Sequence, residues 1–240
     1  MLTVVEIEIN THCNRRCNYC PNSILPSIDP PRYMNDEIFQ RILNELERIK
    51  FDGRLSYHFY NEPLLRMDIE HLVEQVSKKL PRAYQALYTN GDHLSDERYS
   101  RLRKAGIAHF IITRHDYKTI PGRDLQTVLT PDNIKLTNRG GILDKIFGID
   151  SIALSFPCYA PDEMLIVTVN GLVLLCYEDA KRTQVFGNIM ENTLDEIWYS
   201  DKFVRVRRLL AQGKRNEASE ICRKCTNQAH TAIGTSFFAL

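Results

Sequence analysis

The 240-residue chain is long enough to bury a substantial core, as one large domain or as one domain with a smaller appendage. Its net charge is +1, and its 31 Lys and Arg residues are spread along the chain, so we expect neither nucleic acid nor a membrane surface as a partner. A small molecule is the better expectation.

The N-terminal segment "MLTVVEIEIN" is too short and too acidic for a targeting peptide, and no run approaches a membrane span. We therefore expect a cytoplasmic protein. In that reducing compartment, a set of cysteines is better explained by metal ligation or redox chemistry than by structural disulfides.

Strands and helices alternate from the N-terminus to residue 113. The expected strands are 3–10, 53–60, 84–90 and 109–113, and the expected helices are 35–49, 68–80 and 96–106. This alternation predicts a parallel sheet with its functional site beyond the carboxyl ends of the strands.

The alternation of strands and helices ends after residue 114, where turn-rich sequence leads to one further expected strand at 134–138. We therefore expect an open, abbreviated barrel. From about residue 150 the sequence indicates a second, smaller domain with a β-hairpin at 164–179, centred on Asn170-Gly171, and a helix at 193–213. The predicted domains are 1–150 and 151–240.

The seven cysteines fall into two groups. Cys13, Cys17 and Cys20 form a trio after the first strand, and their spacing fits one face of an iron–sulfur cube that keeps one iron open to an external ligand. Cys158, Cys176, Cys222 and Cys225 form a quartet that could close a second site completely. Structural zinc is the alternative for each group, with His12 as a fourth ligand for the trio.

Cys13-x3-Cys17-x-Tyr19-Cys20 resembles the signature of the radical S-adenosylmethionine (SAM) superfamily. The resemblance implies a [4Fe–4S] cluster on the trio whose open iron is chelated by the amino and carboxylate groups of SAM. It also implies reductive cleavage of SAM to a 5′-deoxyadenosyl radical, and hence an external reductant of flavodoxin or ferredoxin type. Tyr19 would contact the adenine.

Further short sequence motifs at strand ends resemble SAM-binding motifs of the family. In "YNEP", Asn61 and Glu62 would accept the methionine ammonium, because a carboxylate suits that cation. Asn90 would face the cofactor, and Arg114 would pair with the methionine carboxylate. Two plainer readings stay open, in which Asn90-Gly91 forms only a turn and Arg114 is a solvated loop charge.

The quartet resembles the twitch domain, a shortened relative of the SPASM domain. Cys158, twelve residues, Gly171, four residues, Cys176 and the later Cys222-x2-Cys225 match its pattern. The resemblance implies one auxiliary [4Fe–4S] cluster. The implied α/β fold is an abbreviated, partial (β/α) radical SAM barrel with a small C-terminal twitch domain of hairpin plus helix.

A narrower resemblance, carried by "HFYNEPLL" and "TNRGGILD", is to the aminocyclitol dehydrogenases of aminoglycoside antibiotic biosynthesis. It implies oxidation of a secondary alcohol to a ketone by hydrogen abstraction, proton loss and electron transfer to the auxiliary cluster. No Gly-x-Gly-x-x-Gly follows a strand to hold a nicotinamide instead. The implied substrate contacts are Tyr60, Tyr88, Arg139 and Glu178.

Arg139 is also the candidate catalytic residue. Because arginine stays protonated, we expect electrostatic help with proton loss from the substrate hydroxyl and no formal base role. Plainer readings remain, in which the tyrosines are merely packed and Arg139 serves only the turn at Gly140-Gly141.

Three other functions compete with this expectation. A radical SAM epimerase or ring-forming oxidase on a sugar or aminocyclitol would often need a thiol hydrogen donor, and all seven cysteines are assigned as ligands. Peptide maturation is disfavoured, because the chain starts at its first strand without room for a leader-recognition domain. If the protein were a non-enzymatic binding module with two metal sites, the resemblance of its sequence to SAM-binding motifs would be a coincidence.

Overall fold

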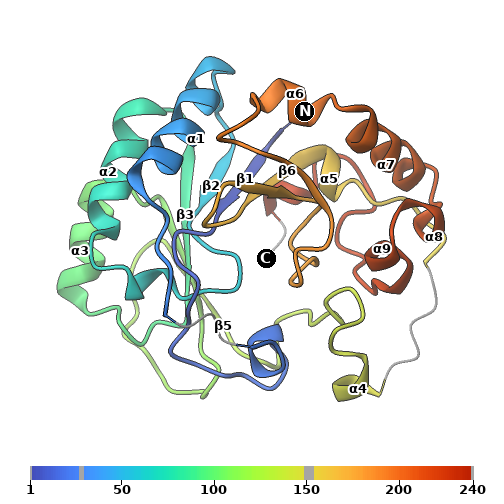
Figure 1. Cartoon of the computed structure of the whole chain (residues 1–240). Helices are drawn as coiled ribbons and strands as arrows, with labels where there is room; N and C mark the ends of the chain where they lie inside the picture. The colour runs from blue at the N-terminus through green and yellow to red at the C-terminus, as the bar shows by residue number, and fades with distance from the viewer. Residues whose placement is uncertain (1, 27–29, 149–153, 239–240) are drawn as a thin grey trace.

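The computed structural model describes residues 2–26, 30–148 and 154–238, which are built around one eight-stranded sheet (Figure 1). Its strand order is β5-β4-β3-β2-β1-β6-β7-β8. The strands are β1 (Val4–Ile7), β2 (Arg54–Ser56), β3 (Tyr84–Thr89), β4 (His109–Thr113), β5 (Gln126–Leu129), β6 (Met164–Val167), β7 (Leu172–Leu174) and β8 (Val185–Asn188). All neighbours from β5 to β6 pair in parallel, whereas β6–β7 and β7–β8 are antiparallel.

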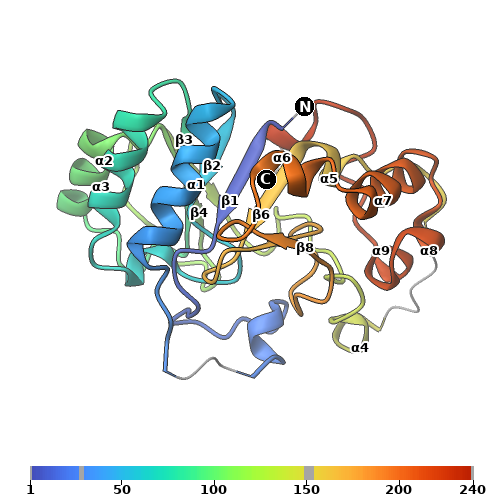
Figure 2. The same cartoon turned by 45° about the horizontal axis from the view of Figure 1, so that its top comes forward.

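Three long helices cover the outer face of the N-terminal strands (Figures 1 and 2). They are α1 (Asp36–Arg48), α2 (Ile69–Lys79) and α3 (Asp96–Ala105). Asn35 and Ser95 cap α1 and α3 with side-chain oxygens that accept backbone N–H bonds. Each helix buries one apolar stripe, as the 3.6-residue period requires.

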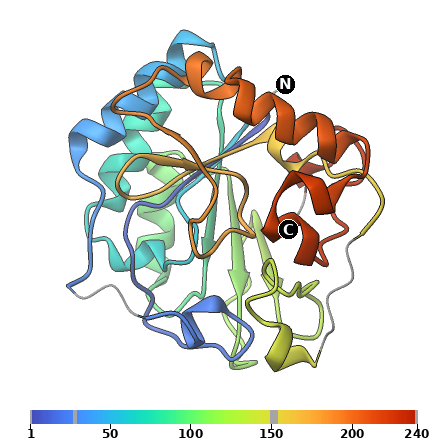
Figure 3. The same ribbon diagram turned by 45° about the vertical axis from the view of Figure 1, so that its right-hand side comes forward.

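The remaining helices lie mainly in the C-terminal part of the chain. They are α4 (Asp144–Phe147), α5 (Ala160–Glu163), α6 (Leu194–Trp198), α7 (Asp201–Ala211), α8 (Arg215–Ala218) and α9 (Glu220–Lys224), with 3-10 turns η1 (Pro21–Ser23), η2 (Pro63–Leu65) and η3 (Ser236–Phe238). Figures 1, 2 and 3 place η1, just after the cysteine trio, at the same end of the molecule as α4.

Alternation along β1 decides what faces the interior of the barrel. Val5 and Ile7 are fully buried in the apolar core, whereas Glu6 and Glu8 point to the opposite face of the strand and line cavities. Both carboxylates are almost inaccessible to solvent, with exposed fractions of 4% and 1%. Such burial is costly for a charge, so the inner face of β1 is built for polar chemistry.

The strands and helices expected up to residue 113 are confirmed; β4 has the expected bounds, and β1, β2 and β3 are shorter than expected. The strand expected at 134–138 is wrong, and the additional strand is β5, in the stretch we assigned to turns. Residues 134–138 contact the C-terminal part of the chain instead, where Asn138 donates to the carbonyl oxygen of Lys224 at 2.6 Å. The end of this segment is thus bonded to the last residue of α9, and the segment is not one of the strands of the sheet.

The helix expected at 193–213 is two helices, α6 and α7, with the break at Tyr199 and Ser200. The Ser200 hydroxyl accepts from the backbone N–H of Phe203 at 3.3 Å and so caps a new helix. Arg207 of α7 is 8% exposed and stacks on Trp198 and Phe203, with its guanidinium carbon 4.7 Å from each ring centroid.

The hairpin is confirmed as β6 and β7, but it does not form a separate sheet. β6 pairs with β1 in parallel, Val4 opposite Met164, so the C-terminal strands extend the N-terminal sheet. The predicted domain boundary at 150/151 lies outside the described residues. No helix in the described ranges has both the length and the apolar character needed to cross a membrane.

Candidate active site

A cavity of about 330 Å³ opens at the carboxyl ends of the parallel strands, a size suited to a small ligand. All three cysteines of the trio line it, as do most of the residues that we singled out from the sequence. Those candidates are Tyr19, Tyr60, Asn61, Glu62, Tyr88, Asn90 and Arg139. The structure thus brings together residues from the ends of β2 and β3 and from two loops far apart in sequence.

The cysteine trio forms one edge of this cavity. Its thiols are free, and Cys13 Sγ accepts hydrogen bonds from the backbone N–H of Arg15 at 3.4 Å and from Asn90 Nδ2 at 3.9 Å. Burial raises the pKa of the Cys13 thiol to about 11. Donors aimed at sulfur suit a thiolate ligand, and hydrogen bonds to sulfur are one means of tuning an iron–sulfur cluster.

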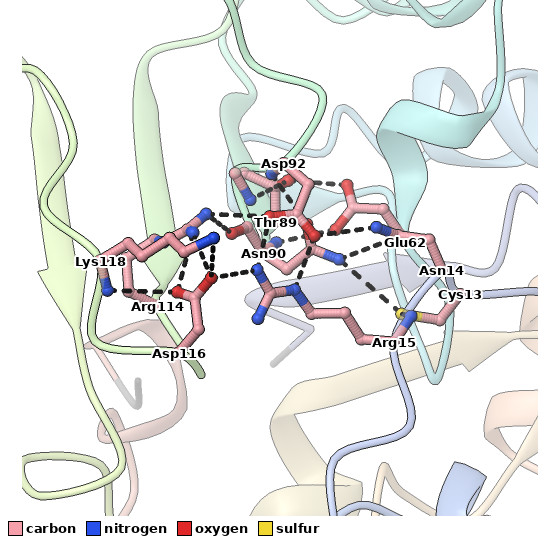
Figure 4. A network of polar contacts seen from close by, with 11 residues as sticks. Cys13, Asn14, Arg15, Glu62, Thr89, Asn90, Asp92, Arg114, Asp116 and Lys118 are labelled. Atoms are coloured by element: carbon pink, nitrogen blue, oxygen red, sulfur yellow. Dashed lines mark hydrogen bonds and ion pairs between the residues drawn. The ribbon is translucent and has the colours of Figure 1, made fainter.

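Glu62 belongs to the polar network in Figure 4, where it lies beside Thr89 and Asn90. One carboxylate oxygen accepts from Leu64 N–H at 3.0 Å and Thr89 Oγ1 at 2.7 Å, and the other accepts from Asn90 N–H at 2.7 Å. Burial raises the pKa of this carboxyl while these donors oppose the rise. The network fixes the carboxylate at the cavity wall. Asn61, by contrast, folds back to accept from Phe59 N–H at 2.8 Å.

Arg114 does not line the cavity. Its guanidinium bonds the Asn90 carbonyl at 2.7 Å, Asp92 at 3.1 Å and Asp116 at 2.8 Å, and only 5% of the residue is exposed. The methionine-carboxylate role predicted for Arg114 remains a prediction, and these contacts favour a structural role. Figure 4 shows Arg15 reaching the same two aspartates, at 2.5 and 2.9 Å.

We did not single out Arg15 from the sequence, yet it lines the cavity between two cysteines of the trio. Its hydrogen bond holds the pKa of Asp92 near 2, so the carboxylate is charged and anchors the loop to β3. Its position inside the cysteine motif was the available signal. Tyr19 bonds His115 Nδ1 through its hydroxyl, which fixes the aromatic side chain at the cavity edge.

Opposite the trio, Arg139 lies between two tyrosine rings, 5.9 Å from the centroid of Tyr60 and 5.8 Å from that of Tyr177. Arg139 has a φ of 50°, and Gly140 and Gly141 follow with φ of 61° and 93°. A Cβ on Gly140 would meet Ile221 at 2.6 Å. The loop therefore needs its glycines, and it presents Arg139 to the cavity in a conformation that few side chains adopt.

Glu178 does not line the cavity but lies behind it. Its carboxylate accepts from Thr137 Oγ1 at 2.9 Å and Asn227 Nδ2 at 2.8 Å, and Arg139 is 3.7 Å away. The carboxylate is thus surrounded by three residues that do line the cavity. Direct contact between Glu178 and a substrate remains a prediction.

The cysteine quartet surrounds a second, small cavity, which Tyr177 and Asn227 share with the larger one. Cys225 Sγ accepts from the backbone N–H of Asn227 at 3.3 Å. In the described residues, no three His, Cys, Asp or Glu side chains are arranged to hold a single metal ion. The fit to iron–sulfur clusters rests instead on the convergence of the free thiols on two cavities and on the donors that bond Cys13 and Cys225.

Two family models match the chain. The radical SAM superfamily model matches residues 7–125, and the model of an iron–sulfur cluster-binding domain, SPASM, matches residues 158–226. The first match covers the trio and the second covers all four cysteines of the quartet.

Individual relatives agree with these matches. The chain is 37% identical to the S-adenosyl-L-methionine-dependent 2-deoxy-scyllo-inosamine dehydrogenase of Niallia circulans, over 95% of this chain and 94% of that one. It is 30% identical to a GTP 3′,8-cyclase of Aquifex aeolicus over 62% of this chain and 42% of that one. A crystal structure of BtrN in complex with AdoMet and 2-DOIA superposes with a TM-score of 0.90 and 33% identity, covering 100% and 99% of the two chains.

Proposed function

The chain belongs to the radical SAM superfamily, and from that premise we propose that it oxidises a secondary alcohol of an aminocyclitol, 2-deoxy-scyllo-inosamine or a close analogue, to the ketone. Its cofactors are SAM and iron–sulfur clusters, as its two domains imply. The likeness to the Niallia circulans dehydrogenase over nearly the whole of both chains supports this substrate class.

The observation that carries the proposal is the position of the larger cavity between the two cysteine groups. The trio lines one side, and among the described residues around the cavity Tyr177 and Asn227 are the two that also line the small cavity of the quartet. When bound, SAM and its cluster supply a radical that abstracts hydrogen, and a cluster on the quartet supplies a one-electron acceptor. A substrate in this cavity lies within reach of both.

We assign the chain's own residues as follows. Cys13, Cys17 and Cys20 hold the SAM-binding cluster, and the quartet holds the auxiliary cluster. Glu62, Asn61, Asn90 and Tyr19 contact SAM, with Glu62 facing its ammonium. Arg15 supports cofactor binding indirectly, by fixing the loop that carries the cysteine trio.

Tyr60, Tyr88 and Arg139 orient the substrate, and misplacement by an ångström would cost much of the rate. Arg139 stays protonated and makes the hydroxyl of the substrate radical more acidic, so that its proton leaves more readily. Glu178 holds Arg139, Thr137 and Asn227 in place around that reaction.

Each turnover starts with one electron from outside, for which we propose a flavodoxin or ferredoxin. A cytoplasmic location fits that donor, and all seven cysteines are free thiols, the form that a reducing compartment maintains. All seven also line one of the two cavities, so epimerisation would have to find a hydrogen donor other than an additional cysteine.

The test is an anaerobic reaction of the cluster-reconstituted protein with reductant, SAM and 2-deoxy-scyllo-inosamine. The proposal expects a product two hydrogens lighter, formed one-to-one with 5′-deoxyadenosine. Deoxyadenosine without any change in substrate mass would reject this substrate and leave the radical chemistry in place.

A further inference from the structure

The hydrogen-bonding direction of Tyr60 is set by the protein. Its hydroxyl donates to the backbone carbonyl oxygen of Tyr177 at 2.6 Å. A tyrosine hydroxyl has one proton, so Tyr60 can offer only a lone pair to a ligand in the cavity that it lines. Tyr60 is therefore a hydrogen-bond acceptor toward the cavity.

Tyr88, on the neighbouring strand end, has the opposite arrangement. Arg54 Nη1 donates to the Tyr88 hydroxyl oxygen at 2.6 Å, and arginine has no acceptor to receive a bond in return. Within the described parts of the chain, no group accepts a hydrogen bond from the Tyr88 hydroxyl, which lines the same cavity. Its proton is thus available to a ligand.

The surroundings of Arg54 hold it in this role. Arg54 is 4% exposed, lies in β2 and has the Glu6 carboxyl group of β1 at 3.9 Å. Its guanidinium carbon is 5.4 Å from the centroid of the Tyr88 ring. On the cavity side, His58 stacks on that ring with centroids 4.2 Å apart and planes at 22°. The ring of Tyr88 is therefore held by two contacts besides the hydrogen bond.

We propose that Arg54 is a positioning residue that makes Tyr88 a hydrogen-bond donor to the substrate, opposite in polarity to Tyr60. The inference rests on the proposed function. It restricts the orientation of an aminocyclitol, because an ammonium group can only donate and therefore cannot face Tyr88. A substrate oxygen therefore faces Tyr88, and an N–H or O–H group of the substrate faces Tyr60.

The test is a double-mutant cycle on substrate binding, measured calorimetrically with cluster-reconstituted protein and SAM but without reductant, so that no turnover occurs. The variants are Tyr88→Phe, Arg54→Gln and the double variant. Glutamine offers an acceptor as well as a donor, so it no longer directs the Tyr88 proton into the cavity. Measurements at pH 6 keep Glu6 protonated once Arg54 is gone, because burial already raises its pKa to about 7.

We expect each single substitution to weaken binding about tenfold and the double variant to be no weaker than about tenfold, because Arg54 acts through Tyr88. Arg54→Gln combined with Tyr60→Phe should instead multiply to about a hundredfold. Tyr84→Phe, at the exposed start of the same strand, is the control and should bind as the wild type does.

A hundredfold loss in the Tyr88→Phe double variant, or an unchanged affinity in Arg54→Gln, would overturn the inference alone. Absence of binding by the wild-type protein would overturn the proposed substrate and the inference with it. Should Arg54→Gln fail to take up iron, Arg54→Asn, whose amide also offers an acceptor as well as a donor, is used for the same cycle with the same expectations.

Discussion

Asn227 Nδ2 donates to Glu178 Oε1 at 2.8 Å, and this pair stands between the larger cavity and the cysteine quartet. The same Glu178 carboxylate lies 3.7 Å from Arg139, whose guanidinium faces the cavity. The Glu178 carboxylate, for which direct contact with the substrate remains a prediction, thus lies behind residues that line the larger cavity. Its effect on the reaction should pass through Arg139.

Substitution of Glu178 tests this relation. Glu178→Gln should lower the turnover number about tenfold, because Arg139 loses the charge that holds it. In an Arg139→Lys background the same substitution should cost less than about threefold, since residues that act as a unit are not additive. Steady-state kinetics measure both, with Glu220→Gln, at an exposed position of α9, as a control. Equal losses in the two backgrounds would indicate that Glu178 acts without Arg139.

The two cysteine groups should lose iron independently. Cys17→Ala is expected to retain about four of roughly eight irons per chain and to lose SAM cleavage. Cys222→Ala should also retain about four irons but still form deoxyadenosine when reduced. Iron analysis and deoxyadenosine assays on the two variants check this. A full complement of iron in both variants would contradict the assignment of the ligands.

Stability should depend on pH through Glu6. Burial raises the pKa of this carboxyl to about 7, against the opposing charges of Arg54 and Arg139, from 4.5 in an exposed setting. Between these values the folded chain holds a proton that the unfolded chain releases, so this stabilisation falls as pH rises and is lost above about 7. Glu6→Gln removes the titration.

The measurement is thermal unfolding of both proteins under anaerobic conditions at pH 5 and pH 8. From pH 5 to pH 8, the free energy of unfolding of the wild type should fall relative to Glu6→Gln by about 2 kcal/mol. Glu8, whose pKa burial also raises to about 7, is common to both proteins and cancels. A constant difference across this range would mean that Glu6 is charged throughout.

Arg215 should be essential to the auxiliary site. It is 1% exposed, and its guanidinium donates to the carbonyl oxygens of Phe156 at 3.1 Å, Pro157 at 3.2 Å and Asn227 at 3.0 Å. Arg215→Lys cannot reach all three, and buried carbonyls without donors should cost about 3 kcal/mol. We expect a lower Tm and loss of auxiliary-cluster iron, whereas Arg208→Lys on the exposed side of α7 should change neither. Unchanged iron content in Arg215→Lys would be the contrary result.

Local sequence was sufficient to predict the N-terminal helices and strands and the grouping of the cysteines. Asn35 and Ser95 caps, helical periods and strand alternation are properties of neighbouring residues, so α1, α3 and β3 could be predicted. The resemblance to known families added the barrel and the cofactors, which the family matches support.

What could not be predicted depends on contacts between distant segments. Residues 134–138 read as a strand until Asn138 is seen to bond Lys224, and β5 has mostly half-buried residues that carry little alternation. The roles of Arg54 and Glu6 are likewise invisible in sequence. They follow from the parallel register of β1 and β2, which sets two oppositely charged residues on adjacent strands beside Tyr88.

The most direct test of the central claim is the fate of the hydrogen on the carbinol carbon. We would use 2-deoxy-scyllo-inosamine bearing deuterium at the carbon to be oxidised, in a single anaerobic turnover. The account predicts a ketone that has lost this deuterium and 5′-deoxyadenosine that contains one deuterium. A ketone formed with unlabelled deoxyadenosine, or deuterium retained in an unoxidised cyclitol, would contradict it.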